Sequence, residues 1–409
     1  MMVVKNQIFH GWRVVAATFV LAAFGWGVGF YGPPVYLHAM REARGWLVGL
    51  VSLAVTVHFL CGAVVVANLP VLYRRLGVPR VTKAGAVLLA VGVTGWALAE
   101  EPWQLFAATL CSGAGWVALG AAAVNAIIAP WFARTRPAAL AMAYNGASIG
   151  GVIFSPLWVM AIGGLRFPVA AMLIGGVTVL VVWVLADIYF ARTPQQMGLL
   201  ADGDTVGTVS AARTVSARPL AGGLLWRDWR FLSLAAGMAC GLFAQIGLLA
   251  HLFSLLVPAL GATLAGVAMG SATAAAILCR SLVGWFMPIA ADRRPVASVS
   301  YPVQILGSVM LFLAAGVDIQ LLVTGVILFG VGIGHATSLP PLIAQVEFPK
   351  EDLARVVPLI VAMSQAAYAF APAAFALMRD AGAVAPALFV AAALIQGMAI
   401  FCFLAGRRR

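Results

Sequence analysis

The sequence predicts an all-α integral membrane protein, in which twelve transmembrane helices form two pseudo-symmetric six-helix bundles. Hydrophobic residues make up 63% of the 409 residues, and Asp, Glu, Lys and Arg together make up only 9%. Soluble chains average about 45–50% apolar and about 25% charged residues, so a soluble fold could not bury this much apolar surface. Two further observations predict this fold: the number of apolar segments of membrane-spanning length, and a weak sequence similarity between the two halves of the chain.

Six segments in each half of the chain are near or above the length of about 20 residues that a membrane helix needs. We number them span 1 to span 12 in chain order. In the first half they occupy residues 12–38, 46–73, 79–99, 103–131, 137–164 and 168–190. In the second half they occupy residues 229–257, 262–290, 296–316, 319–346, 352–379 and 385–405. Several exceed the minimum length, which indicates tilt or extension beyond the lipid.

The segment between the halves, residues 191–228, has no apolar run long enough to span a membrane. It is rich in Gly, Ser, Thr and Ala and contains Arg213, Arg218 and Arg227. This composition is typical of a flexible linker. We therefore expect an N-terminal bundle over residues 1–190, a cytoplasmic linker over 191–228 and a C-terminal bundle over 229–409.

Lys and Arg are distributed unequally between the two sides of the predicted topology. With the N-terminus inside, twenty of the 25 fall in inner loops and tails, and Arg280 falls within a span. The outer loops contain only Arg41, Arg44, Arg166 and Arg379. An excess of positive charge marks the cytoplasmic side, so we expect a multi-pass protein of the cell (inner) membrane with both termini in the cytoplasm. The net charge of +12 follows from this topology, and no nucleic acid is needed to explain it.

Other features of the sequence argue against several functional classes. The five cysteines lie scattered in apolar segments without the spacing of a metal site, so we expect no metal. No P-loop occurs, which argues against ATP-driven transport, and we expect no cofactor. An enzyme needs a nucleophile–base pair or a metal cluster, and the spans contain neither pattern, so we expect no enzymatic activity. A sensor carries a sizeable output domain, for which residues 191–228 are too few.

The two halves echo each other at two short basic turns. The turn after span 2 reads LYRRLGVPR (72–80), and the turn after span 8 reads IAADRRP (289–295). Weak internal symmetry of this kind is found in transporters built from repeated bundles, whose substrate site lies near the midplane between the halves.

These two turns resemble, in degenerate form, the loop 2–3 motif of the major facilitator superfamily and its echo in loop 8–9. The second copy contains Asp292 and Arg293. The first copy departs from the motif, since Arg74 stands where the family usually has Asp, followed by Arg75 and Gly77. The resemblance implies the major facilitator fold, a monomer, and a part in gating for these five loop residues.

Other segments resemble the branch of this superfamily that contains monocarboxylate porters and oxalate/formate-type antiporters. The opening FHGWRVVAATFV (9–20) is similar to that branch's start of span 1, although its acidic residue is missing. WFARTRPAALAMAYNGASIGGVIFSPL (131–157) is similar to the branch's span 4–5 turn and span 5, and Arg280 in span 8 to its substrate-binding arginine. The resemblance implies a secondary active transporter that moves an organic anion by alternating access.

Arg280 also predicts the substrate class from its own chemistry. It lies within an apolar segment, and each of the thirteen acidic residues falls in a loop or near the end of a span. An arginine at the centre of a span costs about 2.5–3.5 kcal/mol on the mildest insertion scale, so compensation is expected. A planar guanidinium binds a carboxylate through two hydrogen bonds, which favours a transported organic anion as the counter-ion. Alternatively, Arg280 caps backbone carbonyls or extends toward the inner face.

One cation within the spans suits one carboxylate. The oxalate-type members that this chain resembles carry a second cation in span 11. Here span 11 reads VPLIVAMSQAAYAFAPAAF (357–375), with Ser364, Gln365 and Tyr368 as its polar residues. A small monocarboxylate is therefore favoured over a dicarboxylate as the substrate. The alternative function is an exporter of amphipathic, drug-like compounds on the same fold.

Histidines within the spans are candidates for substrate contact or proton coupling, because histidine changes charge near neutral pH. His251, in the outer part of span 7, resembles a span 7 histidine of bacterial monocarboxylate porters, and His335 lies near the middle of span 10. His58, in span 2, ranks below both, and a packing role explains each histidine equally well. In the animal porters an Asp precedes the span 8 arginine by four residues, where this chain has Ala276. Proton symport, anion exchange and facilitated movement therefore all stay open.

Further polar residues within the spans complete the expected binding site, because polar groups in lipid tend to face the interior of the bundle. Helix-to-helix hydrogen bonds explain some of them. Those expected to contact the substrate are Tyr31, Gln245, Tyr368, Gln365, Asn125 and Tyr144. The expected partners are the anion, the lipid bilayer, and protons or a counter-anion.

Overall fold

The structure is a computed structural model that describes residues 9–203, 222–286, 292–380 and 386–407. Every regular element in these ranges is a helix. Arg213 and Arg218 of the expected linker, and the start of the turn after span 8, lie outside the described residues.

The first half of the chain forms spans 1 to 6, and three of these spans are interrupted. Span 1 comprises α1 (His10–Gly29) and α2 (Gly32–Arg44). Spans 2 and 3 are α3 (Val48–Leu76) and α4 (Val78–Leu98), and span 4 comprises α5 (Pro102–Leu119) and α6 (Ala121–Ile128). Span 5 is α7 (Arg136–Leu165), and span 6 is α8 (Phe167–Leu185) with a π-helical turn over Ala186–Phe190.

The second half forms spans 7 to 12 after a single turn, α9 (Gly222–Leu225). The helix α10 (Trp229–Phe286) is divided at Gly261, whose φ of 72° is left-handed, so that it forms both span 7 and span 8. Spans 9 and 10 are α11 (Arg293–Leu313) and α12 (Ile319–Glu347). Span 11 comprises α13 (Lys350–Tyr368) and α14 (Ala371–Asp380), and span 12 is α15 (Pro386–Ala405). Eleven helices of the described chain are long and apolar enough to cross a membrane, and counting α10 as two gives the predicted twelve.

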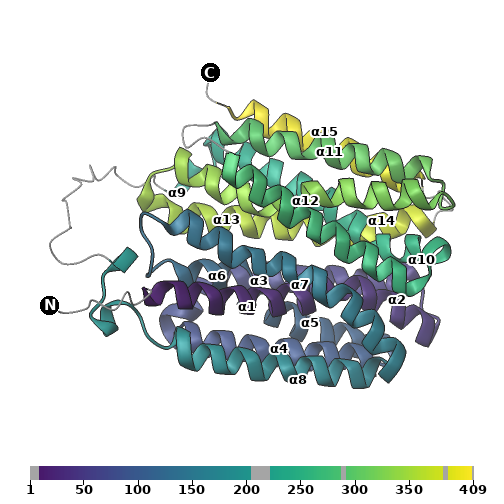
Figure 1. The fold of residues 1–409 in the computed structure, drawn as a ribbon, viewed down its shortest axis with the longest axis horizontal. Helices are drawn as coiled ribbons and strands as arrows, with labels where there is room; N and C mark the ends of the chain where they lie inside the picture. Colours follow the sequence, from purple (N-terminus) through teal and green to yellow (C-terminus); the bar gives the residue numbers. More distant parts are fainter. Residues whose placement is uncertain (1–8, 204–221, 287–291, 381–385, 408–409) are drawn as a thin grey trace, which may run out of the picture.

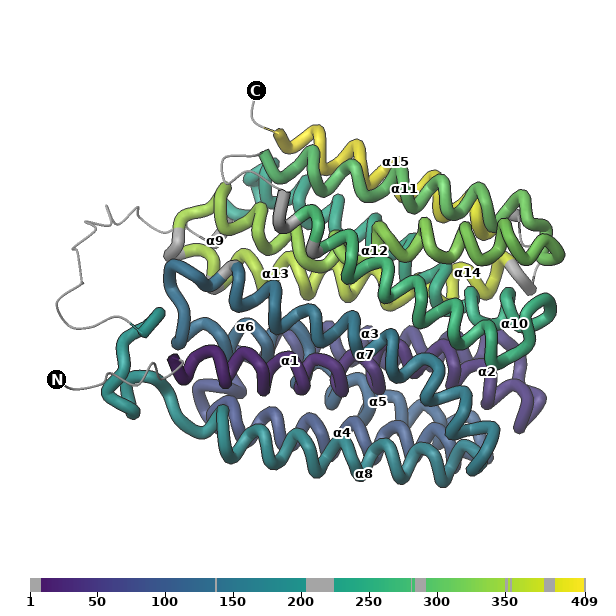
Figure 2. Tube along the Cα trace, in the orientation of Figure 1, coloured from purple at the N-terminus to yellow at the C-terminus, as the bar shows by residue number. Residues whose placement is uncertain are grey.

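The two halves of the chain lie one against the other along the length of the molecule (Figure 1). Helices α1 to α8 form the lower half in this view and α10 to α15 the upper half. Both termini lie at one end, on the left in Figures 1 and 2, which we call the terminal end. We call the opposite end the far end. Across the boundary between the halves, α7 packs on α10, and α3 packs on α13 and α14.

Span 1 breaks at Phe30 and Tyr31 for a local reason. The two prolines at 33 and 34 lack an N–H, and a proline in the first turn of a helix loses no hydrogen bond, so α2 begins here. The N–H groups of Phe30 and Tyr31 both donate to the carbonyl of Trp26, which closes the end of α1. The break places Tyr31 between the halves, next to Thr273 of α10.

The start of the linker is fixed to the first half by Asp202. Its carboxylate, 4% exposed, accepts hydrogen bonds from the N–H groups of Ala133, Arg134 and Thr135, at 3.1, 2.8 and 3.2 Å, and from the Thr135 hydroxyl at 2.6 Å. Its own N–H donates to the carbonyl of Trp131. Burial alone raises the pKa of this carboxyl, but the four hydrogen bonds outweigh burial and hold the pKa below its usual value. Asp202 thus fastens the linker to the turn between spans 4 and 5.

Candidate functional site

A cavity of about 650 Å³, partly open to solvent, lies between the two halves around Arg280. We call it the Arg280 cavity. It is lined from α6 and α7 of the first half and from α10 and α12 of the second half, by Asn125, Leu140, Ala141, Tyr144, Arg280, Val283, His335, Ser338, Leu339, Pro341, Leu342 and Gln345. Since α7 begins and α12 ends at the terminal end, the cavity extends from Arg280 toward that end (Figure 1).

Arg280 uses only part of its hydrogen-bonding capacity. Its Nε donates to the carbonyl of Gly334 at 3.0 Å and its Nη1 to the carbonyl of Tyr144 at 3.4 Å. A guanidinium has five N–H donors, so three remain without a partner among the described residues. Within the same residues no carboxylate lies at ion-pair distance, as the sequence predicted. The alternative role, capping of backbone carbonyls, holds for two of the five donors only.

Gly334 makes room for the guanidinium. A Cβ at this position would lie 3.1 Å from Nε and 3.2 Å from Nη2 of Arg280, which is closer than ordinary packing allows. Its carbonyl also accepts a hydrogen bond from the Ser338 hydroxyl at 2.8 Å. The absence of a side chain at Gly334 therefore lets α12 approach Arg280 closely, so that the Gly334 carbonyl accepts from Nε. The two Nη groups stay in the cavity wall.

His335 follows directly and lines the same cavity. The residue is 4% exposed, and neither ring nitrogen has a hydrogen-bond partner of good geometry in the part of the chain that the structure describes. The Val331 carbonyl, one turn earlier on α12, is the backbone group near enough to act on the ring. A buried polar group without a partner costs about 1–3 kcal/mol. The His335 imidazole is therefore available to hydrogen-bond a ligand beside Arg280.

Asn125 and Tyr144 form the opposite wall. The Asn125 amide donates to the Tyr144 hydroxyl at 2.7 Å and to the carbonyl of Ala121 at 2.9 Å. The Tyr144 hydroxyl donates to the same carbonyl at 3.2 Å. These bonds fix both side chains, and the Tyr144 carbonyl is the one that receives Arg280 from the other half. Four of the nine residues predicted to contact the substrate, Arg280, His335, Asn125 and Tyr144, are thus brought together.

Tyr31 lines a second, apolar cavity of about 390 Å³ on the far-end side. The wall of this cavity includes Phe30, Pro33 and Leu37 of the first half and Leu249 of the second. Tyr31 lies close enough to Arg280 to interact with it electrostatically. It therefore stands between the two cavities.

The other predicted contact residues lie outside the Arg280 cavity. The Nε2 atom of His251 is 2.9 Å from the carbonyl of Pro372, so it joins α10 to α14. The Gln365 amide donates to the carbonyl of Phe59 at 3.2 Å, and the ring of Tyr368 packs on the ring of Phe59. Gln245 is buried, its Oε1 has no partner within the described ranges of the chain, and it lines neither cavity.

His58, the lowest-ranked histidine, has both ring nitrogens engaged. Nδ1 lies 2.8 Å from the Ser112 hydroxyl and Nε2 lies 3.0 Å from the carbonyl of Gly29. These contacts join α3 to α5 and to the end of α1, as expected of a packing histidine.

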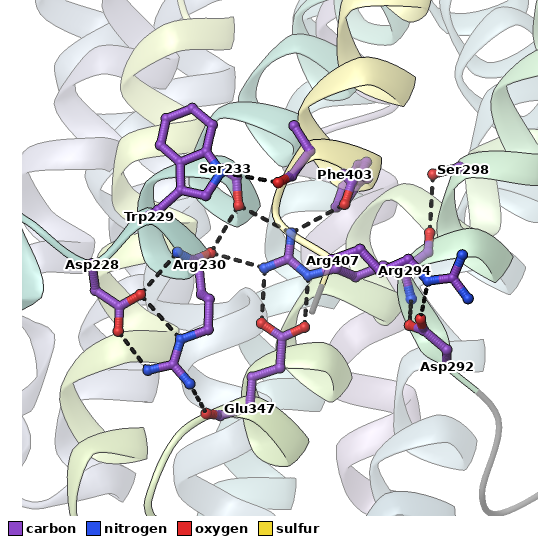
Figure 3. Close-up of polar contacts among 11 residues, drawn as sticks. Asp228, Trp229, Arg230, Ser233, Asp292, Arg294, Ser298, Glu347, Phe403 and Arg407 are labelled. Carbon is purple, nitrogen blue, oxygen red and sulfur yellow. Dashed lines mark hydrogen bonds and ion pairs between the residues drawn. The ribbon is translucent and has the colours of Figure 1, made fainter. Parts of the chain in front are cut away.

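The predicted gating residues occupy the terminal end. Arg74 and Arg75 are exposed at the end of α3, without a partner among the described residues, and Gly77 ends that helix with φ 81°. Asp292 accepts from Nε of Arg407 at 2.6 Å, as Figure 3 shows. Arg293 donates to the carbonyl of Leu342 at 2.8 Å, close to the mouth of the Arg280 cavity.

The sequence did not predict the ion pair between Arg294 and Glu347 (Figure 3). Arg294, 1% exposed, donates from Nε and Nη2 to the two Glu347 oxygens at 2.6 and 2.8 Å. It also donates to the Ser233 hydroxyl and to the carbonyls of Arg230 and Phe403. All of these partners belong to the second half, so the cluster joins the ends of α10, α11, α12 and α15. The sequence signal that could have indicated this ion pair is the group of charged residues near the terminal ends of several spans.

Comparisons with known proteins place the chain in a family. Residues 15–372 match the profile of the Major Facilitator Superfamily. A curated relative, "MFS-type transporter 1" of Ophiocordyceps sp. (strain BCC 1869), is 29% identical over 186 residues, or 44% of this chain and 40% of the relative. The match thus spans less than half the length of that relative.

Two solved structures share the fold. A mutant form of the nucleoside transporter NupG superposes with a TM-score of 0.70 at 11% identity, covering 97% of this chain and all of that one. A bacterial homologue of the human lysosomal transporter Spinster, in an inward-facing and occupied conformation, gives 0.64 at 13% identity, covering 98% and 97%. At such identity the likeness concerns the fold alone. The chain belongs to the Major Facilitator Superfamily and has the multi-pass membrane fold of its transporters.

Proposed function

We propose that this chain is a secondary active transporter of an organic anion with one carboxylate, which Arg280 binds during alternating access. The observation that carries the proposal is a guanidinium in a cavity between the halves, with three N–H donors free and no carboxylate paired to it among the described residues. A carboxylate satisfies two such donors at once. The membership of the monocarboxylate and oxalate/formate branch remains part of this proposal.

The packing of the halves supports alternating access. On the far-end side they meet closely, since a Cβ on Gly151 of α7 would lie within 2.6–2.9 Å of Thr273 and Tyr31. Gly270 of α10 similarly faces Val152. On the terminal side the same helices diverge around the Arg280 cavity. The distribution of Lys and Arg favours an inner-membrane protein with both termini in the cytoplasm. In that orientation the Arg280 cavity opens toward the cytoplasm, so the conformation is inward-facing.

His335 is the histidine we propose for coupling, because it lines the cavity beside Arg280 and His251 does not. A positive guanidinium disfavours a second positive charge on the neighbouring imidazole, and a bound carboxylate cancels that effect. Anion and proton would then bind cooperatively, which is the requirement of symport.

An exporter of amphipathic compounds is the alternative function, favoured by the apolar part of the cavity wall. A neutral cargo would leave the Arg280 donors unpaired, and an unpaired buried charge is costly.

Thermal stability of the purified protein against a panel of carboxylates tests the proposal, because a ligand of the folded state stabilises it by mass action. We expect stabilisation by monocarboxylates in the wild type and in Arg192→Gln, an exposed arginine outside the spans. Arg280→Gln should lose it. If equal stabilisation survives in Arg280→Gln, or if only neutral amphipaths stabilise, the anion proposal is wrong and the exporter replaces it.

A further inference from the structure

The Arg280 cavity has a polar end and an apolar end. On α7, α10 and α12 the polar residues Tyr144, Arg280 and His335 lie deepest, near the middle of the spans. Toward the terminal end the lining is mostly apolar, with Leu140 on α7, Val283 on α10 and Leu339 on α12. Ser338, whose hydroxyl donates to the carbonyl of Gly334, and Gln345, the last lining residue of α12, are the polar residues on this side. The polarity of the lining therefore falls between Arg280 and Gln345.

The apolar end is deep enough to hold more than a short acid. On α12 the lining continues from His335 past Ser338 to Leu339 and Leu342, and ends at Gln345. Seven residues of helix rise about 10 Å, so the mostly apolar wall extends about that far, from His335 to Leu342.

The length of this wall bears on the fit of a ligand. A two- to four-carbon acid held at Arg280 would leave the Leu and Val side chains toward the mouth in contact with water, which is unfavourable.

The cavity also limits the charge of its ligand. Among the described residues that line it, Arg280 is the charged one. Arg293, near the mouth, directs a guanidinium nitrogen to the Leu342 carbonyl. A second charge between Arg280 and the mouth would lie against Leu140, Val283 or Leu339 without a charged partner among the described lining residues, at a large desolvation cost.

We propose that the substrate is an amphipathic monoanion, with its carboxylate at Arg280 and an apolar chain or aryl group that extends past Val283 to Leu342. This inference rests on the proposed function and narrows its substrate class to acids of the medium-chain or aryl-alkanoic kind.

A series of straight-chain acids and their neutral amides tests this substrate class. Binding of acetate, butyrate, hexanoate and octanoate, each beside its primary amide, is measured to the protein in lipid nanodiscs. We expect the dissociation constant of the acids to fall about fourfold for each methylene that enters the apolar wall. The amides report partition into the lipid, and we expect them to show no specific binding. Arg280→Gln should bind none of the acids.

Two filling variants test the apolar wall. Val283→Phe and Ala141→Phe place a ring in the apolar end from opposite sides, and Ala141 is exposed at the rim, where the ring is tolerated. In both, the ratio of octanoate affinity to butyrate affinity should fall to about one. Leu278→Phe, on the lipid-facing side of the same helix, is the matched control and should behave as wild type.

The outcomes separate the inference from the proposed function. If affinity stays flat or falls beyond butyrate while Arg280 is still required, the substrate is a small acid, so the inference is wrong and the proposed function stands. The same holds if the filling variants keep the full octanoate gain. If amides bind as well as acids and Arg280→Gln binds like wild type, or if no acid binds at all, both are wrong.

Discussion

The Nε atom of Arg280 on α10 donates a 3.0 Å hydrogen bond to the carbonyl of Gly334 on α12. The bond joins spans 8 and 10 of the second half and fixes one edge of the guanidinium. The Nη1 contact with Tyr144 comes from the first half. A ligand carboxylate that replaces the Tyr144 carbonyl at Nη1, where the contact is 3.4 Å, would break the link between Arg280 and the first half. The bond from Nε to the Gly334 carbonyl of α12 would stay. The asymmetry of these two bonds suits an anion site at the boundary between the halves.

Gly334→Ala should weaken anion binding and lower the melting temperature. The added methyl group would lie 3.1–3.2 Å from the guanidinium nitrogens and 2.8 Å from the backbone carbonyl oxygen of Ala276, so α12 must move away from α10. The gain of about 1 kcal/mol for alanine over glycine in a helix does not remove this backbone overlap. We expect a lower melting temperature, with affinity for the acid about tenfold weaker, or about 1.4 kcal/mol. Gly176→Ala, whose added methyl meets nothing within 4 Å, is the control. Wild-type affinity in Gly334→Ala would contradict the anchoring role.

Gly151→Ala should shift the protein away from the arrangement described here. Its methyl group would lie 2.6 Å from Thr273 Cγ2 and 2.7 Å from Tyr31 Cζ. Thr273 belongs to the other half, so parting the halves on the far-end side relieves the overlap with Thr273 and gives the Tyr31 ring room to move aside. Electron-spin distances between labels at Glu42 and Ala262, in a cysteine-free background, should lengthen. Gly163→Ala, on the same helix with open space around it, should leave the distances unchanged. Unchanged distances in Gly151→Ala would mean that this contact is no gate.

His335→Gln should separate binding from coupling. Glutamine keeps a hydrogen-bonding group beside Arg280 but takes up no proton near neutral pH. We expect acid binding to change by less than about fivefold, since the guanidinium is retained, while proton movement driven by the acid is lost. Internal pH in proteoliposomes measures that movement. His251→Gln should retain it, because His251 contacts the Pro372 carbonyl of α14 and does not line the Arg280 cavity. Coupling that persists in His335→Gln and disappears in His251→Gln would reverse this assignment.

Glu347→Gln should destabilise the second half by about 3–5 kcal/mol, because it leaves the buried Arg294 guanidinium without its counter-charge. Replacing both partners, as Arg294→Met with Glu347→Leu, should recover much of the loss, since an apolar pair avoids an unpaired buried charge. Melting temperatures of the two single variants and the double variant give the coupling. Purely additive losses would show that the pair is not a unit.

Asp202→Asn should lower stability at neutral pH and do so less in acid. The pKa of Asp202 is lowered in the folded protein, so its contribution is fully present above the unfolded pKa of about 3.9 and is lost as the pH falls through the folded value. The difference in melting temperature between wild type and Asp202→Asn should therefore be constant above about pH 5 and narrow below about pH 4. A difference that persists down to the folded pKa and beyond would contradict a carboxylate role.

Apolar runs and the breaks between them predicted the spans. Lipid requires each crossing segment to be apolar and to form its backbone hydrogen bonds within the segment. The break at Gly261 falls in the gap predicted between spans 7 and 8. Arg280 was predictable for the same reason: a cation is so costly within a span that its presence indicates a compensating partner. The family was likewise predictable from residues in two turns, and the profile match confirms it.

Tertiary contacts decided the rest. His251 and His335 are both single histidines in apolar spans, and only their neighbours distinguish them, the Pro372 carbonyl for one and the Arg280 cavity for the other. Arg294 and Glu347 lie 53 positions apart, so no local pattern joins them. Gln365 and Tyr368 were expected to contact substrate, but the helix phase of α13 directs them to Phe59.

Uptake of a labelled monocarboxylate into proteoliposomes measures whether Arg280 binds the transported carboxylate. Wild type, Arg192→Gln, Arg280→Lys and Arg280→Gln are compared over a range of acid concentrations. We expect saturable uptake by wild type and Arg192→Gln, and no uptake by Arg280→Gln. Arg280→Lys should show a raised KM, because lysine keeps the charge but cannot form the bidentate hydrogen bond. Uptake by Arg280→Gln at the wild-type rate and KM would show that the carboxylate does not bind Arg280.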